Sequence, residues 1–303
     1  IILLTSINDP STDIIINWLK SVDVNYIRLN TEDLTDTLHY SYEITDSTDA
    51  INLSTDENIN ITAKQNIFFR RYGTLIYPNT KNIKNTEDRL SIEKHLKEEL
   101  RANRDGLYNL LSNNNWIGNP DNACINKILA LTIAKKAGLN IPNTIVTNNK
   151  ERLIKFCSGN SDCIIKCISD VDTFKIEKKY FSLYTNVLLK ENLDSLPETF
   201  FPSIFQENVT KEYEIRTFFF DGKIFSMAIF SQKDDKTSTD YRQYNKEKQN
   251  RCIPFLLPND IELKIIDFFQ KINMRTGSVD LIKSITGKYV FLEVNPAGQF
   301  GFV

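Results

Sequence analysis

Residues 278–296, SVDLIKSITGKYVFLEVNP, predict a β-hairpin near the C-terminal end of the chain. The runs 278–283 and 289–294 are mostly apolar, which is typical of buried strands. Thr286-Gly287 stands between them as a turn signal. The segment is therefore expected to place two strands side by side.

Three side chains with a carboxylate or carboxamide group interrupt this apolar hairpin: Asp280 in the first strand, and Glu293 and Asn295 in the second. Glu293 and Asn295 are two residues apart, so they project from the same face, and pairing of the strands brings Asp280 close to them. Two carboxylates and a carboxamide form an all-oxygen site that suits Mg²⁺ holding phosphate oxygens. The alternative is a polar, solvated sheet face.

Cationic side chains stand at positions that favour an anionic partner. Lys166 lies in the apolar run 163–168, where a buried ammonium needs either a nucleotide phosphate or a structural carboxylate. Arg216 lies in a predicted strand with Glu214 on the same face, which suits either phosphate recognition or a surface ion pair between the two. Lys127 lies on a predicted helix and is either a phosphate ligand or a solvated lysine.

Composition excludes several classes of protein. The chain has 303 residues, of which 41% are hydrophobic and 25% charged, and its formal net charge is −2. These values predict a folded, multidomain protein and argue against a generally basic nucleic-acid binder. No apolar run approaches the roughly 18–20 residues of a membrane helix. The first residue is not Met, so we expect that the natural chain begins earlier.

Cysteine and glycine patterns remove further alternatives. None of the five cysteines forms a C-x-x-C pair, and with two histidines a zinc site or a histidine-dependent hydrolase is disfavoured. Reduced thiols in the cytoplasm are the simpler interpretation. Neither G-x-G-x-x-G nor G-x-x-x-x-G-K-[ST] occurs, so a Rossmann or P-loop nucleotide site lacks its main signal.

Hydrophobic patterning predicts an α+β protein that contains α/β units. The first thirty residues read as β-α-β, with Ile14, Ile15, Trp18 and Leu19 on one helical face. Asp221-Gly222 predicts a second hairpin. Further helices are expected at 87–111, from Asp121 to Ala137, at 150–157 and at 261–272. The predicted domains are 1–115, 116–205 and 206–303.

The order of these motifs resembles the ATP-grasp superfamily over residues 116–300. The resemblance implies three domains, with ATP and Mg²⁺ held between the central and C-terminal ones. It implies metal ligands Asp280, Glu293 and Asn295, and Arg216 and Arg242 as catalytic residues. The implied nucleotide contacts are Lys127 and Lys166 on phosphates, Glu214 on ribose, and the hinge Gln206, Glu207, Asn208 and Val209 on adenine.

Within that superfamily the chain is similar to the graspetide (microviridin-type) peptide ligases, especially the grasp-with-spasm maturases. The similarity rests on 69–71 (FRR), 240–242 (DYR) and 295–300 (NPAGQF). It implies a cytoplasmic ligase that activates Asp or Glu side chains of a ribosomal precursor peptide as acyl phosphates. These are then joined to Thr or Ser hydroxyls or Lys amines. Residues 169–186 lack the glycines expected of a flexible loop over the phosphates, which weakens any claim about loop closure. Relatives usually continue with a helix beyond Val303, so we expect an incomplete C-terminus.

Two other functions remain open at this stage. A RimK-like ligase would add a free amino acid to a carboxylate with the same site, and a non-catalytic relative would only bind peptides. The partner implied is a precursor peptide with leader and core, without nucleic acid or membrane, and a homodimer is left open. The polar segment 231–251 is expected to bind the leader, the alternative being a surface loop, and charge reversal at Lys246 and Lys248 would test this.

Overall fold

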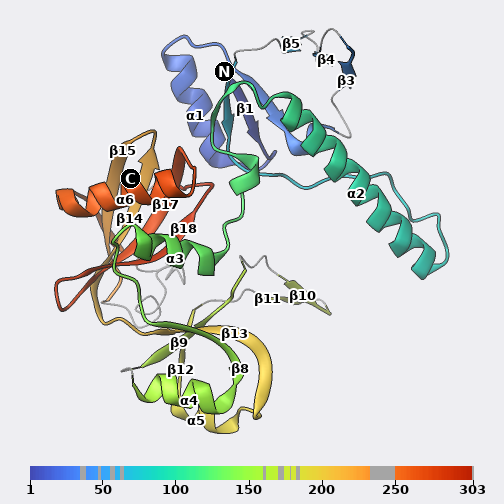
Figure 1. Cartoon of the computed structure of the whole chain (residues 1–303). Coiled ribbons are helices and arrows are strands. Elements are labelled where there is room, and N and C mark those ends of the chain that lie inside the picture. The colour runs from blue at the N-terminus through green and yellow to red at the C-terminus, as the bar shows by residue number, and fades with distance from the viewer. Residues whose placement is uncertain are drawn as a thin grey trace. The chain divides into compact units, whose positions relative to one another are not determined.

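The chain forms two compact units, Ile1–Ala123 and Cys124–Val303. The structure is a computed structural model, shown in Figure 1. It describes residues 1–34, 39–46, 49–54, 59–61, 65–159, 162–169, 174–177, 179–181, 185–232 and 250–301. The predicted mixture of helices and sheets is confirmed. Within these residues, no helix is long and apolar enough to cross a membrane.

The first unit is built on a parallel sheet with the strand order β2-β1-β6-β7. The β-α-β opening predicted from the sequence is confirmed. β7 pairs with β6 and so belongs to this unit, which ends at Ala123. The elements are β1 (Ile2–Thr5), α1 (Pro10–Ser21), β2 (Ile27–Asn30), η1 (Thr31–Leu34), β6 (Asn66–Phe69), α2 (Thr86–Leu110), β7 (Asn115–Ile117) and η2 (Pro120–Asn122), with a small sheet of β3 (His39–Ile44), β4 (Asp49–Ser54) and β5 (Ile59–Ile61).

Helix α1 does not bury its whole apolar face. Trp18 is 70% exposed and Ile14 44%, whereas Thr12 is fully buried. The Thr12 hydroxyl donates a hydrogen bond to the Asp9 carboxylate at 2.6 Å, and Thr5 donates to the same oxygen at 2.8 Å. The helix therefore joins its unit partly through a buried polar cluster, which a hydrophobic pattern does not reveal.

The second unit contains two sheets and a separate hairpin. The first sheet has the order β12-β9-β13-β8 and carries α4 and α5. Its strands are β8 (Thr144–Asn149), β9 (Cys163–Lys166), β12 (Asn186–Leu188) and β13 (Thr199–Glu207), and the helices are α4 (Lys150–Ser158) and α5 (Lys190–Ser195). The separate hairpin consists of β10 (Phe174–Ile176) and β11 (Lys179–Phe181).

The second sheet is antiparallel and has the order β16-β15-β14-β17-β18. Both predicted hairpins are confirmed, with Asp221 and Gly222 at φ +46° and +87° as a tight I′-type turn requires. The elements are β14 (Lys211–Phe220), β15 (Lys223–Phe230), β16 (Arg251–Phe255), α6 (Asn259–Lys271), β17 (Thr276–Ser284) and β18 (Tyr289–Asn295).

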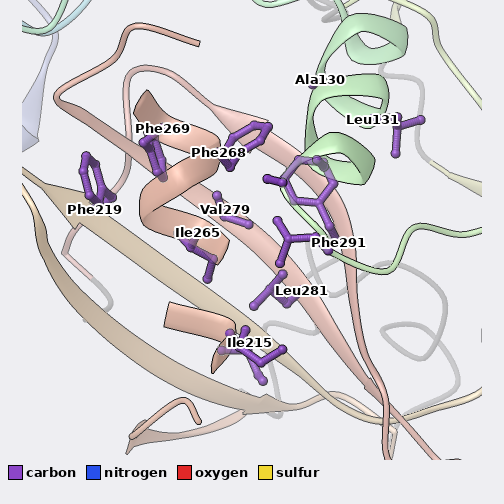
Figure 2. Packing of buried hydrophobic residues seen from close by; sticks show 14 of the residues in the cluster. Ala130, Leu131, Ile215, Phe219, Ile265, Phe268, Phe269, Val279, Leu281 and Phe291 are labelled. Atoms are coloured by element: carbon purple, nitrogen blue, oxygen red, sulfur yellow. The ribbon is translucent and has the colours of Figure 1, made fainter. Parts of the chain in front are cut away.

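One face of this sheet packs against α6 and α3 (Lys127–Lys136) to form the core of the unit (Figure 2). The rings of Phe219 and Phe269 stack at 4.2 Å between centroids. Val279 and Leu281 are fully buried on the same face. Because strand residues alternate, Asp280 and its neighbours of even number on β17 must point to the opposite face.

The helix predicted from Asp121 begins later, so that prediction is wrong at its N-terminal end. Pro120–Asn122 forms the short η2 instead, and α3 starts at Lys127. The Asn126 side chain caps α3 by accepting hydrogen bonds from Ile128 N at 2.9 Å and Leu129 N at 3.1 Å. Gly138 at φ +79° follows its C-terminal end, as the sequence predicts.

Candidate functional site

Strand pairing sets three charged residues in one row across the second sheet. Arg216 on β14 lies opposite Asp280 on β17, and Asp280 lies opposite Glu293 on β18. Residues directly opposite each other in an antiparallel pair share a face. The row therefore faces away from the core described above, and the hairpin brings the two carboxylates together as the sequence predicts.

Arg216 holds Asp280 in a buried ion pair. Its Nη1 donates to Asp280 Oδ1 and Oδ2, each at 2.9 Å. Arg216 is 5% exposed and Asp280 7%. The predicted ion pair of Arg216 is formed with Asp280 rather than with Glu214, because the register puts the guanidinium beside Asp280.

A bulge in β18 shapes the same region. Asp280 pairs with Glu293, but the next residue, Leu281, pairs with Phe291, so Leu292 has no opposite residue on β17. Regular alternation would send Leu292 and Glu293 to opposite faces, yet both line one pocket. The bulge thus adds an apolar side chain next to a carboxylate.

Glu214 lies further along the same face, in contact with a lysine that the sequence analysis missed. Lys211 Nζ donates to Glu214 Oε1 at 2.5 Å, and Ser231 Oγ donates to the same oxygen at 2.9 Å. Burial raises the pKa of Glu214, and the lysine and the serine act against that rise. A lysine three residues before Glu214 was the available signal for this pair.

The first sheet of the unit supplies the facing wall through β9 and β13. Lys166 lies opposite Ile204, and Gln206 lies opposite Ile164. Gln206 is 1% exposed, and its Nε2 donates to Thr144 Oγ1 at 2.9 Å. Within the described part of the chain, its Oε1 has no hydrogen-bond partner. A buried acceptor of this kind fits a ligand that brings a donor, such as the amino group of a base.

One pocket joins these two walls, and most of the predicted site residues line it. Of the expected residues, Lys127, Arg216 and Asn295 lie outside the lining, and Arg242 falls outside the described residues. The lining consists of Pro142, Ile164, Lys166, Thr185, Gln206, Glu207, Asn208, Val209, Lys211, Glu214, Asp280, Ile282, Leu292 and Glu293.

Lys127 contacts the segment that follows β9. Its Nζ donates to the carbonyl oxygen of Cys167 at 3.4 Å and to that of Ser169 at 3.3 Å. These bonds tie the start of α3 to the chain that leaves β9. Asn295, at the end of β18, lies opposite Ser278, two residue pairs beyond Asp280 and Glu293.

The donor set fits a nucleotide with Mg²⁺. The lining combines apolar side chains and the Gln206 acceptor with two lysines and four carboxylates. No group of three or more His, Cys, Asp or Glu side chains that could hold a metal occurs among the described residues. Mg²⁺ needs no such group when phosphates supply oxygens, because one or two carboxylates then suffice.

No protein-family model and no curated protein sequence matches the chain. Solved structures do. A Chryseobacterium gregarium RiPP-associated ATP-grasp ligase, in complex with ADP and a leader and core peptide, is 24% identical, with a TM-score of 0.85 over 99% of this chain and 90% of that one.

Two further structures show the same similarity. The macrocyclase MdnC from Microcystis aeruginosa MRC, bound with the precursor peptide MdnA, is 23% identical (TM-score 0.79, 99% and 92% covered). The ATP-grasp ligase PsnB, complexed with a phosphomimetic variant of its minimal precursor, Mg and ADP, is 16% identical (TM-score 0.75, 99% and 91% covered). The pocket between two sheets and the similarity along the whole chain agree: this chain has the fold of the ATP-grasp ligases.

Proposed function

We propose that the chain is an ATP-dependent ligase that closes rings in a ribosomally made precursor peptide. The observation that carries the proposal is a pocket that joins the buried Gln206 acceptor to the Asp280–Glu293 carboxylate pair. The solved ligases of the same fold support it, since three of them hold peptides described as leader and core or as precursors.

The nucleotide enters this proposal as a substrate held by both walls. Gln206 and the hinge Glu207, Asn208 and Val209 bind the base, while Glu214 accepts hydrogen bonds from ribose hydroxyls. Lys166 and Lys211 neutralise phosphate charge. A bound Mg²⁺ would be held by Asp280, Glu293 and Asn295 and would polarise the phosphate oxygens.

The reaction proceeds in two steps. A substrate carboxylate oxygen attacks the γ-phosphorus, ADP leaves, and an acyl phosphate forms. The acceptor hydroxyl or amine then attacks the carbonyl carbon, the phosphate leaves, and the acceptor's proton passes to solvent. Overall, one ester or amide and one ADP and phosphate form per ATP, and the first step supplies the leaving group that a free carboxylate lacks.

Arg216 positions the Asp280 carboxylate. Two hydrogen bonds from one guanidinium nitrogen fix the carboxylate orientation, so Asp280 is positioned before a metal arrives. Direct contact of Arg216 with the transferring phosphoryl group, and a role of Arg242 in orienting the acyl group, stay predictions, as does leader binding by 231–251, of which 233–249 lie outside the described residues.

Two further parts of the proposal concern the division of the second unit into domains and the location of the protein in the cell. We divide the second unit into a central part that carries β8, β9, β12 and β13 and a C-terminal part that carries β14–β18. A cytoplasmic location is supported by the five cysteines, all described and none in a disulfide.

Mass spectrometry tests the proposed function. A candidate precursor encoded beside the gene is incubated with the protein, ATP and Mg²⁺, and each ring should lower the peptide mass by one water. A mass gain equal to an amino acid residue would instead indicate the RimK-like activity. Peptide binding without ATP consumption or mass change would indicate a non-catalytic module.

A further inference from the structure

An apolar strip adjoins the charged row on the same face of the second sheet. It consists of Phe218 on β14 with Phe225 and Met227 on β15, and we call it the aromatic shelf. Phe218 lies opposite Phe225, and Arg216 lies opposite Met227. Since Phe219 packs into the core, Phe218 and Arg216 share the other face, with Asp280.

The shelf is fixed at one side and open at the other. The Phe218 ring is 8% exposed and lies 6.2 Å from the ring of Phe220 and 5.4 Å from that of Phe300, measured between centroids. Phe225, next to it, is 51% exposed. A rigid aromatic floor with one accessible ring is an arrangement that can bury an apolar side chain of a ligand.

The position of the shelf indicates what would occupy it. Ile282 and Asp280 both line the nucleotide pocket, and Ile282 is nearer to the C-terminal end of β17. Ser278, opposite Phe218, comes next along the same face. The shelf thus lies beyond the carboxylates, on the side away from Ile282. In the proposed function Glu214, opposite Ile282, binds the ribose and Asp280 holds the metal at the phosphates, so the nucleotide runs from Ile282 towards Ser278. The carboxylate that attacks the γ-phosphate is then expected at the Ser278 end, and the peptide that carries it extends over Phe218.

We propose that the aromatic shelf binds an apolar side chain near the reacting carboxylate of the substrate peptide, and so makes the enzyme select acidic residues with apolar neighbours. This inference rests on the proposed function. Alternate residues of an extended peptide are roughly 6.6–6.8 Å apart, the same as Arg216 and Phe218 along β14. The side chain bound by the shelf is therefore expected two positions from the acidic residue.

Two short peptides test the selection without knowledge of the natural precursor. Both are acetylated and amidated, with a central Glu: Gly-Phe-Gly-Glu-Gly-Phe-Gly and Gly-Ser-Gly-Glu-Gly-Ser-Gly. Hydroxylamine is added with ATP and Mg²⁺; it attacks the acyl phosphate, phosphate leaves, and the peptide hydroxamate is measured. The expected kcat/KM for the Phe peptide exceeds that for the Ser peptide about tenfold, as partial burial of one aromatic ring predicts.

A variant at the exposed ring assigns the preference to the shelf. Phe225→Ala should bring the ratio of the two kcat/KM values below about threefold and leave the value for the Ser peptide and the affinity for ADP unchanged. The matched control is Phe201→Ala, because Phe201 is 86% exposed on β13 of the other sheet and should leave the ratio at its wild-type value.

The outcomes separate this inference from the proposed function. Equal rates for the two peptides with the wild-type protein, or a tenfold preference kept by Phe225→Ala, would overturn the shelf alone. If the protein closes rings in a precursor but forms hydroxamate from neither peptide, the shelf inference would also be overturned. An apolar side chain two positions away would then not be enough to bind the reacting carboxylate. Absence of hydroxamate together with absence of ring formation would overturn the proposed function itself.

Discussion

Replacing Asp280 by Asn should destabilise the second unit as well as stop turnover. Asp280 is 7% exposed and accepts two hydrogen bonds of 2.9 Å from Arg216, which is 5% exposed. Asn keeps one acceptor oxygen but removes the negative charge, so the buried guanidinium loses its compensation. Removing one partner of a buried ion pair lowers the free energy of unfolding by about 3–5 kcal/mol. Because Asp280→Asn keeps one hydrogen bond, its expected loss is at the lower end, about 3 kcal/mol.

Urea and thermal denaturation measure this cost. For a domain of this size, about 3 kcal/mol corresponds to a fall in Tm of roughly 6–12 °C. Arg216→Met and the double variant complete a double-mutant cycle. The double variant leaves no uncompensated buried charge, so its loss of unfolding free energy should be smaller than the sum of the two single losses by about 2 kcal/mol.

Glu293→Gln is the matched control for function. It also removes a carboxylate from the pocket, but Glu293 is only partly buried, so the variant should lose less than about 1 kcal/mol of stability. Both Asp280→Asn and Glu293→Gln should abolish ring formation, and only the first should unfold early. Additive losses in the cycle would refute the buried-pair argument, and full ring formation by Glu293→Gln would refute its role as a metal ligand.

Three further predictions concern the nucleotide and the first unit. Lys166→Ala should weaken ADP binding more than Lys127→Ala, measured by calorimetry, because Lys166 lines the pocket and Lys127 donates to main-chain carbonyls; equal affinities would contradict this. Gly118→Ala should lower the Tm of the first unit, because Gly118 has φ +78° and an added Cβ would lie 2.2 Å from the carbonyl oxygen of Phe69. Despite burial, a hydrogen bond from Thr12 and the charge of a nearby arginine lower the pKa of Asp9, so its stabilisation is complete above about pH 4 and is lost as pH falls through its folded pKa. Asp9→Asn should therefore destabilise the unit at neutral pH and flatten its stability between pH 5 and 2, as followed by circular dichroism, and an unchanged pH profile would contradict this.

Local sequence determined the two hairpins of the second unit and the composition of its charged row. Asp221-Gly222 supplies two residues at positive φ and Thr286-Gly287 supplies one, Gly287, so the turns are specified by residues adjacent in sequence. The two-residue period of a strand then decides which side chains share a face. That period is why Asp280 and Glu293 could be expected together before any coordinates were known.

Tertiary structure decided which partner each charged residue meets. Arg216 could have paired with Glu214, two residues away, but the register of β14 against β17 sets it beside Asp280. The register of β17 against β18 also contains the bulge at Leu292, because Asp280 pairs with Glu293 and Leu281 with Phe291. The extra residue changes which side chains of β18 share a face. Register depends on the packing of whole strands against α6 and on their neighbours, which no short motif encodes.

The facing wall of the pocket depended on tertiary structure in the same way. Gln206 could be predicted near the hinge, but its burial and its bond to Thr144 arise from pairing between β13 and β8, strands that lie far apart in the sequence. Lys211 joins Glu214 because the strand is irregular between Lys211 and Tyr213. The sequence by itself therefore determined which residue types the site contains, and long-range strand pairing decided their distances, their burial and their partners, because those depend on contacts between segments that only the folded chain brings together.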